Sequence, residues 1–172
     1  QHLAAILASA PDAADRLRDV LETNRSSEFP AEDLRDRFEQ FLAESEQIVP
    51  SVPCRLDDAA LGEFAQLVDR SQALTTDLLE NQVPETIHLA RSARDLGAIA
   101  ASAFGAGFGG SVWALIRKEE AEEFCSRWSE SYSAAFPARS QQAAFFTTPT
   151  GPAAFCLAGI CADGSWRPKD QV

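Results

Sequence analysis

The stretch Phe104-Gly105-Ala106-Gly107-Phe108-Gly109-Gly110-Ser111 decides the fold of this sequence, because it places four glycines between two uncharged runs. These runs extend from Ala98 to Phe104 and from Ser111 to Ile116. Short apolar runs on both sides of a glycine cluster predict two strands joined by a loop. Because glycine has no Cβ atom, such a loop can adopt positive φ angles and bring backbone N–H groups together around an anion.

The same region must be tested against a membrane span, since residues 97–116 carry no charge over twenty positions. Gly105 and Gly109 match the GxxxG spacing of packed membrane helices. Five of the twenty residues are glycine, however, and each costs about 1 kcal/mol relative to alanine inside a helix. The composition therefore favours a buried segment interrupted by a loop.

Gly105, Gly107 and Gly110 also satisfy the GxGxxG pattern of dinucleotide-binding proteins. Such a site requires a helix that opens at the last glycine, so that the pyrophosphate meets the helix N-terminus. Here the following residues predict a strand, which argues against a dinucleotide site. Spacing alone leaves two alternatives open, a glycine-rich hairpin without a ligand and a loop that binds an anion.

The residues before Gly97 predict a series of helices, with apolar side chains at helical spacing. The expected helix starts lie after Asp12, at Pro30, at Asp57 or Asp58 and near Pro84, and the expected ends lie at Pro50, Pro53 and Gly97. Another helix is expected from about Lys118 to Pro137, with an apolar face formed by Ala121, Phe124, Cys125, Trp128 and Tyr132. Residues 143–148 and 153–157 predict two further strands around a turn at Gly151.

These elements predict an α+β fold in which an antiparallel sheet is backed by helices. Residues 1–160 are expected to form one domain, with a helical part at 1–96 and a hairpin and sheet part at 97–160. Residues 161–172 are expected to form a loose tail, because they are polar and contain proline.

The chain has a net charge of −11, and most of it belongs to the helical part. Residues 1–96 hold nine basic and nineteen acidic residues, whereas residues 97–172 hold six and seven. The acidity predicts solvated helix faces in an added helical layer. It also argues against nucleic acid or an anionic membrane as the main partner, since both require clustered Lys and Arg.

The four cysteines, Cys54, Cys125, Cys156 and Cys161, form no CxxC pair and have no histidine at a metal-ligand spacing. We therefore expect reduced, structural thiols, no metal site and a cytoplasmic protein. The sequence opens at Gln1 and contains no Met, so we expect either a removed leader or a piece of a longer protein.

The stretch from Phe104 to Ile116 resembles the third signature motif of the GHMP kinases, and its Gly-Ala-Gly-Phe-Gly-Gly form resembles the galactokinase branch. Weaker similarity to that branch extends over about residues 34–157. It includes residues 37–44 and 47–49, Ser71-Gln72 at a common Ser-His pair, and residues 145–151 at the closing strand.

The resemblance implies that the chain is the C-terminal part of a kinase that transfers the γ-phosphoryl group of Mg-ATP to a monosaccharide, galactose-like and at the anomeric hydroxyl. The residues expected to line the substrate and nucleotide cleft are Gly105, Ala106, Gly107, Phe108, Gly109, Gly110 and Ser111. No catalytic residue is expected in this chain, because the family's ATP loop and its catalytic Asp and Arg lie in the N-terminal part. That N-terminal domain would be the main partner, beside sugar and ATP.

Two departures from the family pattern keep alternatives open. Phe104 stands where the family has Ser or Thr, and Gln72 replaces the histidine of the Ser-His pair. A non-catalytic sugar- or partner-binding module on the same fold is one alternative, and another GHMP small-molecule kinase is the second. If Gly107 lies against a bound phosphate, a valine at this position should lower turnover without unfolding the protein.

Overall fold

A computed structural model describes residues 3–24, 28–56, 58–149 and 151, together with the backbone of two short paired segments near the C-terminus. These segments are β3, Gly159–Ile160, and β4, Trp166–Arg167, which pair antiparallel. They lie on either side of the expected boundary at residue 160, which stays a prediction. The expected strand at 153–157 lies outside the described residues, as do Asp57, Cys156 and Cys161.

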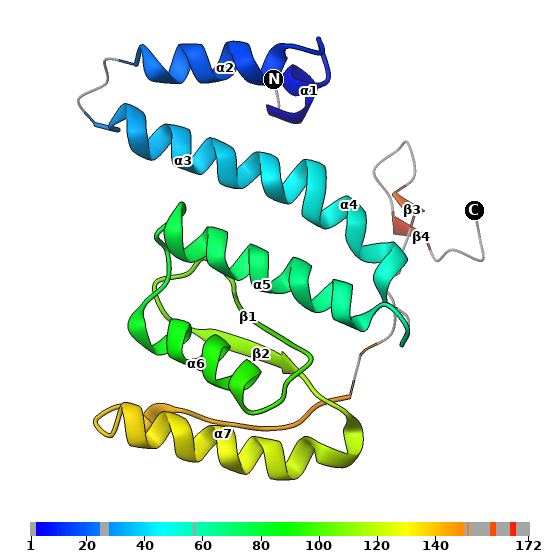
Figure 1. The fold of residues 1–172 in the computed structure, drawn as a ribbon, viewed down its shortest axis with the longest axis vertical. Helices are drawn as coiled ribbons and strands as arrows, with labels where there is room; N and C mark the ends of the chain where they lie inside the picture. Colours follow the sequence, from blue (N-terminus) through cyan, green and yellow to red (C-terminus); the bar gives the residue numbers. More distant parts are fainter. Residues whose placement is uncertain are drawn as a thin grey trace.

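Successive layers build the described part of the chain (Figure 1). The outermost layer contains α1, Leu3–Leu7, and α2, Ala13–Glu22, and the next contains α3, Ala31–Leu42, with its continuation to Arg55. Helix α5, Leu61–Asp77, separates these layers from the hairpin formed by β1, Ala100–Phe104, and β2, Ser111–Leu115. Helices α6, Pro84–Asp95, and α7, Ala121–Ala135, complete the fold. The predicted α+β fold with an acidic helical layer is confirmed.

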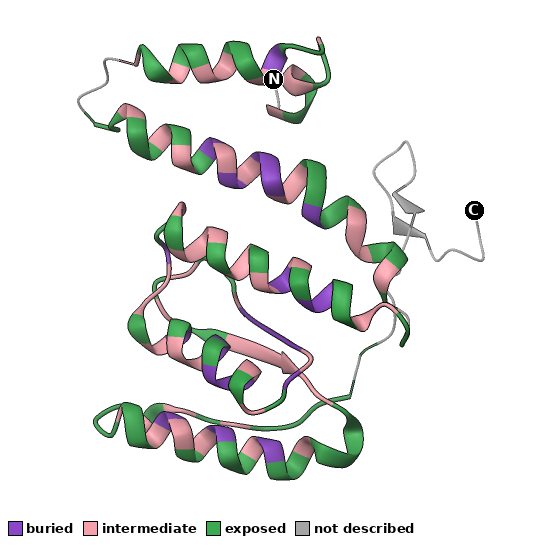
Figure 2. Cartoon of the chain, viewed as in Figure 1, coloured by how far each residue is buried: buried purple, intermediate pink, exposed green. Residues whose placement is uncertain are grey.

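The hairpin confirms the two strands expected around the glycines. β1 and β2 pair antiparallel, with Ala100 opposite Leu115 and Phe104 opposite Ser111. Alternate residues of β1 point to opposite faces of the hairpin. Ala101 therefore packs with Phe124 and Trp128 of α7, whereas Ala100 packs with Phe64 and Val68 of α5. Buried residues on α5 and α7 accordingly face the hairpin, and Figure 2 shows further buried residues between α3 and its neighbouring helices.

The predicted helix end at Pro50 and Pro53 is wrong, because the chain stays helical to Arg55. After α3 it forms a π-helix, η1, Ala43–Ile48, then α4, Val49–Ser51, and a 3-10 turn, η2, Val52–Arg55. Proline inside an α-helix lacks the N–H donor and clashes with the carbonyl four residues earlier. Here the wider π turns precede the proline, and each proline occupies a first-turn position of its segment, where no N–H donor is needed.

Two further expectations need correction. Ala60 occupies the N-cap position of α5, so Asp58 does not cap this helix. Residues 143–149 form no strand, and none of the described strands pairs with them. Side-chain packing holds this segment instead, with the ring of Phe145 at 5.3 Å from that of Trp128. Short 3-10 turns, η3 at Lys118–Glu120 and η4 at Ser140–Gln142, flank α7.

Helix α6 begins and ends where the sequence predicts, at Pro84 and before Gly97. Gly97 has a φ of 103°. Its N–H donates to Arg94 O, and the Ala98 N–H donates to Ala93 O, which together form a Schellman C-cap. This cap directs the chain straight into β1.

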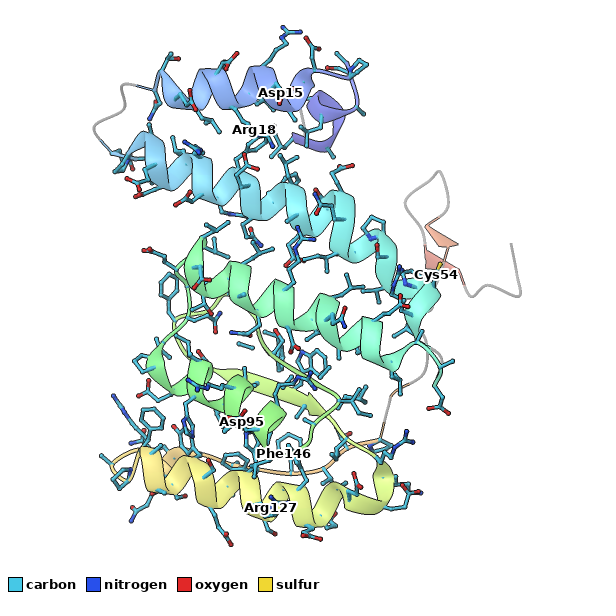
Figure 3. All side chains as sticks on the ribbon, in the orientation of Figure 1. Asp15, Arg18, Cys54, Asp95, Arg127 and Phe146 are labelled. Carbon is cyan, nitrogen blue, oxygen red and sulfur yellow. The ribbon has the colours of Figure 1, made fainter. Side chains whose placement is uncertain are left out.

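An ion pair connects the two outer helical layers. The Arg18 guanidinium donates to both carboxylate oxygens of Glu39, at 2.6 and 3.0 Å, and to Asp15 at 2.7 Å. Figure 3 shows Arg18 and Asp15 on α2. The hydrogen bonds from Arg18 lower the pKa of Glu39, and those to Glu39 raise the pKa of Arg18. Of the helices that the structure describes, none is long and apolar enough to cross a membrane.

Candidate functional site

The loop between β1 and β2 adopts the backbone conformation that its glycines make available. Positive φ angles occur at Gly105 (94°), Gly107 (87°), Phe108 (60°), Gly109 (115°) and Gly110 (101°). Phe108 is a bulky residue in the left-handed region, which is uncommon and requires support from the surrounding structure. The loop thus has one fixed shape that L-residues at the glycine positions would strain.

Asn81, in the segment between α5 and α6, provides this support. Its backbone carbonyl accepts a hydrogen bond from the Phe108 N–H at 2.5 Å, and its Nδ2 donates to Ala106 O at 3.1 Å. Asn81 is only 8% exposed, so these bonds are shielded from water. No local sequence pattern connects Asn81 with a loop 25 residues away, so its role could not be predicted.

The four loop glycines differ in what lies beside them. A Cβ atom on Gly107 would lie 2.3 Å from Asn81 O and 2.5 Å from its Nδ2. Cβ atoms on Gly105, Gly109 and Gly110 would have no atom within 4 Å. Gly107 is therefore required for packing against Asn81. A valine at position 107 would clash with Asn81, so this substitution does not test ligand binding. The other three glycines leave open space beside the loop.

Two aromatic side chains, one at the end of β1 and one within the loop, are exposed. Phe104 is 57% exposed and Phe108 is 76% exposed, although a buried position is usual for such large apolar residues. Ser111, the last predicted site residue, is also exposed, at the start of β2. The predicted site residues thus form one continuous, uncharged and accessible backbone surface.

Gln72 fixes β1 immediately before the loop. Its Oε1 accepts hydrogen bonds from the Ala103 N–H at 2.8 Å and from the Ser102 hydroxyl at 3.0 Å. The neighbouring Ser71 turns the other way and donates to Glu44 of the π-helix at 2.6 Å. The Ser-Gln pair therefore connects helix α5 to the hairpin on one side and to the outer helical layer on the other.

Two clefts lie elsewhere in the described part of the chain, and neither is lined by a loop residue. One, of about 240 Å³, lies between α5 and α6, where Arg94 pairs with Asp69 at 3.0 Å. The other, of about 290 Å³, lies between α5 and the outer layer and contains Arg18 and Arg70. Among the described residues, no group of three or more His, Cys, Asp or Glu side chains could hold a metal ion. The loop therefore offers backbone groups, glycine space and aromatic rings, and no charged side chain.

Comparison with known proteins agrees with this architecture. The family model described as GHMP kinases C terminal matches residues 56–134, which include α5, Asn81 and the whole loop. Residues 56–134 are thus similar in sequence to a GHMP kinase C-terminal domain.

Among solved structures, the fold is similar to that of Lactococcus lactis galactokinase complexed with galactose, with a TM-score of 0.57 and 22% sequence identity. The similarity covers 70% of this chain and 31% of the Lactococcus chain, so this chain spans less than a third of that protein. No curated protein sequence matches the chain.

Proposed function

We propose that this chain is the C-terminal portion of an ATP-dependent sugar kinase that phosphorylates a galactose-like monosaccharide, at the anomeric hydroxyl. The observation that carries this proposal is the loop from Gly105 to Gly110, which combines positive φ angles with open space beside three glycines. The GHMP kinase C-terminal match and the galactokinase-like fold support the same reaction class.

The loop suits a phosphate-bearing ligand, because a Cβ atom at Gly105, Gly109 or Gly110 would occupy space that stays free beside the backbone. Backbone N–H groups there can stabilise phosphate oxygens without any charged side chain. When bound, Mg-ATP supplies the phosphoryl group, and catalysis of such transfers is mostly positioning and charge stabilisation. In this proposal Gly105 to Ser111 form one wall of the cleft, and no residue of this chain acts as the catalytic base.

The opposite wall belongs, in this proposal, to an N-terminal domain that carries the ATP loop and the catalytic carboxylate. The exposed rings of Phe104 and Phe108 support such a partner, since large apolar side chains exposed close together in the sequence are typical of a binding face. The lack of clustered basic residues in the sequence supports a protein that does not bind nucleic acid. The absence of CxxC pairs among the four cysteines supports a cytoplasmic location.

A substrate panel tests the proposal on the full protein that contains this chain. ADP release would be measured with Mg-ATP and a series of hexoses, pentoses and 1-deoxy sugars. We expect turnover with a galactose-like sugar and none with its 1-deoxy analogue. Turnover only with a non-sugar alcohol would instead indicate another GHMP small-molecule kinase.

A second candidate function is a non-catalytic sugar- or partner-binding module, which the phenylalanine at position 104 favours. This ring stands where the family has a small hydroxyl side chain, and it is 57% exposed. If the full protein binds a sugar by calorimetry but releases no ADP with any member of the panel, the binding module is correct.

A further inference from the structure

Asn81 uses every one of its polar groups inside the protein. Besides the two bonds to the loop, its backbone N–H donates to Thr75 O of α5 at 3.3 Å, and its Oδ1 accepts from Gln82 Nε2 at 2.9 Å. Glu80, directly before it, has a φ of 50°, which is strained for a non-glycine residue. The chain thus adopts an uncommon backbone conformation at the residue that precedes Asn81.

A line of hydrogen bonds fixes the orientation of the Asn81 carboxamide. Gln82 donates to its Oδ1, and the Thr86 hydroxyl donates to Gln82 Oε1 at 2.9 Å. Thr86 is 2% exposed and belongs to the first turn of α6. Because the Oδ1 is occupied by Gln82, the Nδ2 is the group that faces the loop and holds Ala106 O.

These contacts decide which loop amides are available to a ligand. The Phe108 N–H is turned onto Asn81 O and cannot also serve an anion. Within the part of the chain that the structure describes, the other N–H groups of residues 105–110 make no hydrogen bond, and open space lies beside Gly105, Gly109 and Gly110. Asn81 thus covers one side of the loop and leaves the other side free.

We propose that Asn81 is the positioning residue of the glycine-rich loop, and that it engages the Phe108 amide and leaves the other loop amides, those of Gly109 and Gly110 among them, as the donors to a phosphate group. This inference rests on the proposed kinase function for the identity of the ligand, and on the hydrogen bonds alone for the positioning. Asn81 acts through the loop and touches no substrate.

Asn81→Asp in the full protein tests this role, since aspartate keeps the oxygen that accepts from Gln82 and replaces the donor to Ala106 by a carboxylate oxygen that repels the Ala106 carbonyl. The matched control is Gln47→Glu, an amide-to-carboxylate change at an exposed residue of η1, which keeps the oxygen that accepts from Arg70. We expect kcat/KM for ATP to fall about tenfold in Asn81→Asp, with KM for the sugar close to that of the control. The melting temperature should fall below that of the control, because the new carboxylate is buried.

Hydrogen exchange of the amides of residues 105–110 provides a readout that does not depend on catalysis. In Asn81→Asp these amides should exchange about tenfold faster than in the control, while those of α7 stay unchanged. Unchanged exchange in the loop would overturn the positioning role, whether or not the protein is a kinase. If the wild-type protein shows no kinase activity but the loop amides exchange faster in Asn81→Asp, the positioning role of Asn81 stands and the proposed kinase function is rejected. Faster exchange with unaltered kcat/KM for ATP would overturn the assignment of the Gly109 and Gly110 amides.

Discussion

Replacing single loop glycines by alanine separates the glycine that packs from those that face open space. Gly107 and Gly109 both have positive φ angles, 87° and 115°, so alanine at either position carries about 1–2 kcal/mol of backbone strain. Only at Gly107 would the new Cβ atom also lie 2.3 Å from Asn81 O. Asn81 is buried and cannot move aside without breaking its bonds to the loop.

The expected magnitudes follow from this difference. Gly109→Ala should lower the free energy of unfolding by the backbone strain alone, about 1–2 kcal/mol. Gly107→Ala should add the loss of the two hydrogen bonds between Asn81 and the loop, each worth about 1 kcal/mol, for a total of about 3–4 kcal/mol. Turnover should fall in both variants among folded molecules. The methyl group introduced by Gly109→Ala would project into the space proposed for phosphate, whereas Gly107→Ala would release the loop from Asn81.

Urea unfolding of the full protein and its two variants, followed by tryptophan fluorescence, measures the stability difference, and initial rates of ADP release measure turnover. We expect Gly109→Ala to fold and to lose at least about tenfold in kcat/KM for ATP. If Gly107→Ala is as stable as Gly109→Ala, the close packing against Asn81 is wrong. If Gly109→Ala keeps wild-type kinetics, the loop is a structural hairpin and binds no phosphate.

Three further predictions concern other parts of the chain. Glu39→Gln should lower the free energy of unfolding by about 1 kcal/mol or less at pH 7, because the pair with Arg18 is partly exposed. Because Arg18 lowers the pKa of Glu39, the pair stabilises the protein at pH values above the ordinary carboxyl pKa. This stabilisation is lost as the pH falls through the lowered pKa of Glu39 in the folded protein. The urea midpoints of wild type and Glu39→Gln should therefore converge in acid. Burial raises the pKa of the Cys125 thiol, so iodoacetamide at about pH 8 should modify the exposed Cys54 first. Peptide mass spectrometry would measure both rates, and faster modification of Cys125 would contradict its burial. The isolated 172-residue chain should release no ADP above background with any hexose, and measurable turnover would place catalytic groups in this chain.

The hairpin and most helices could be predicted because their signals are local. The glycine cluster sits between two uncharged runs, and Phe124, Trp128 and Tyr132 recur at the spacing of one helix face, which the structure buries. Such patterns report which side of an element faces the core, whatever the rest of the chain does. Such local patterns also predict that the uncharged residues 97–116 form two strands and a loop.

Features that depend on contacts between distant segments could not be predicted. Pro50 was expected to end a helix, but the preceding π turns and its first-turn position let the helical path continue to Arg55. Residues 143–148 have strand-forming side chains, but a strand exists only where a partner strand is available. The role of Asn81 likewise depends on a loop 25 residues later.

Gln72 shows how a departure from a family pattern can be structural. A carboxamide oxygen has two lone pairs, and Gln72 Oε1 uses them for the Ala103 N–H and the Ser102 hydroxyl. A neutral imidazole has a single acceptor nitrogen, so histidine at this position could accept only one of these bonds. Both bonds hold β1 directly before Phe104, where the loop begins. Glutamine therefore fixes the start of the loop more completely than histidine would, and its presence at position 72 is by itself no argument that a kinase has lost its activity.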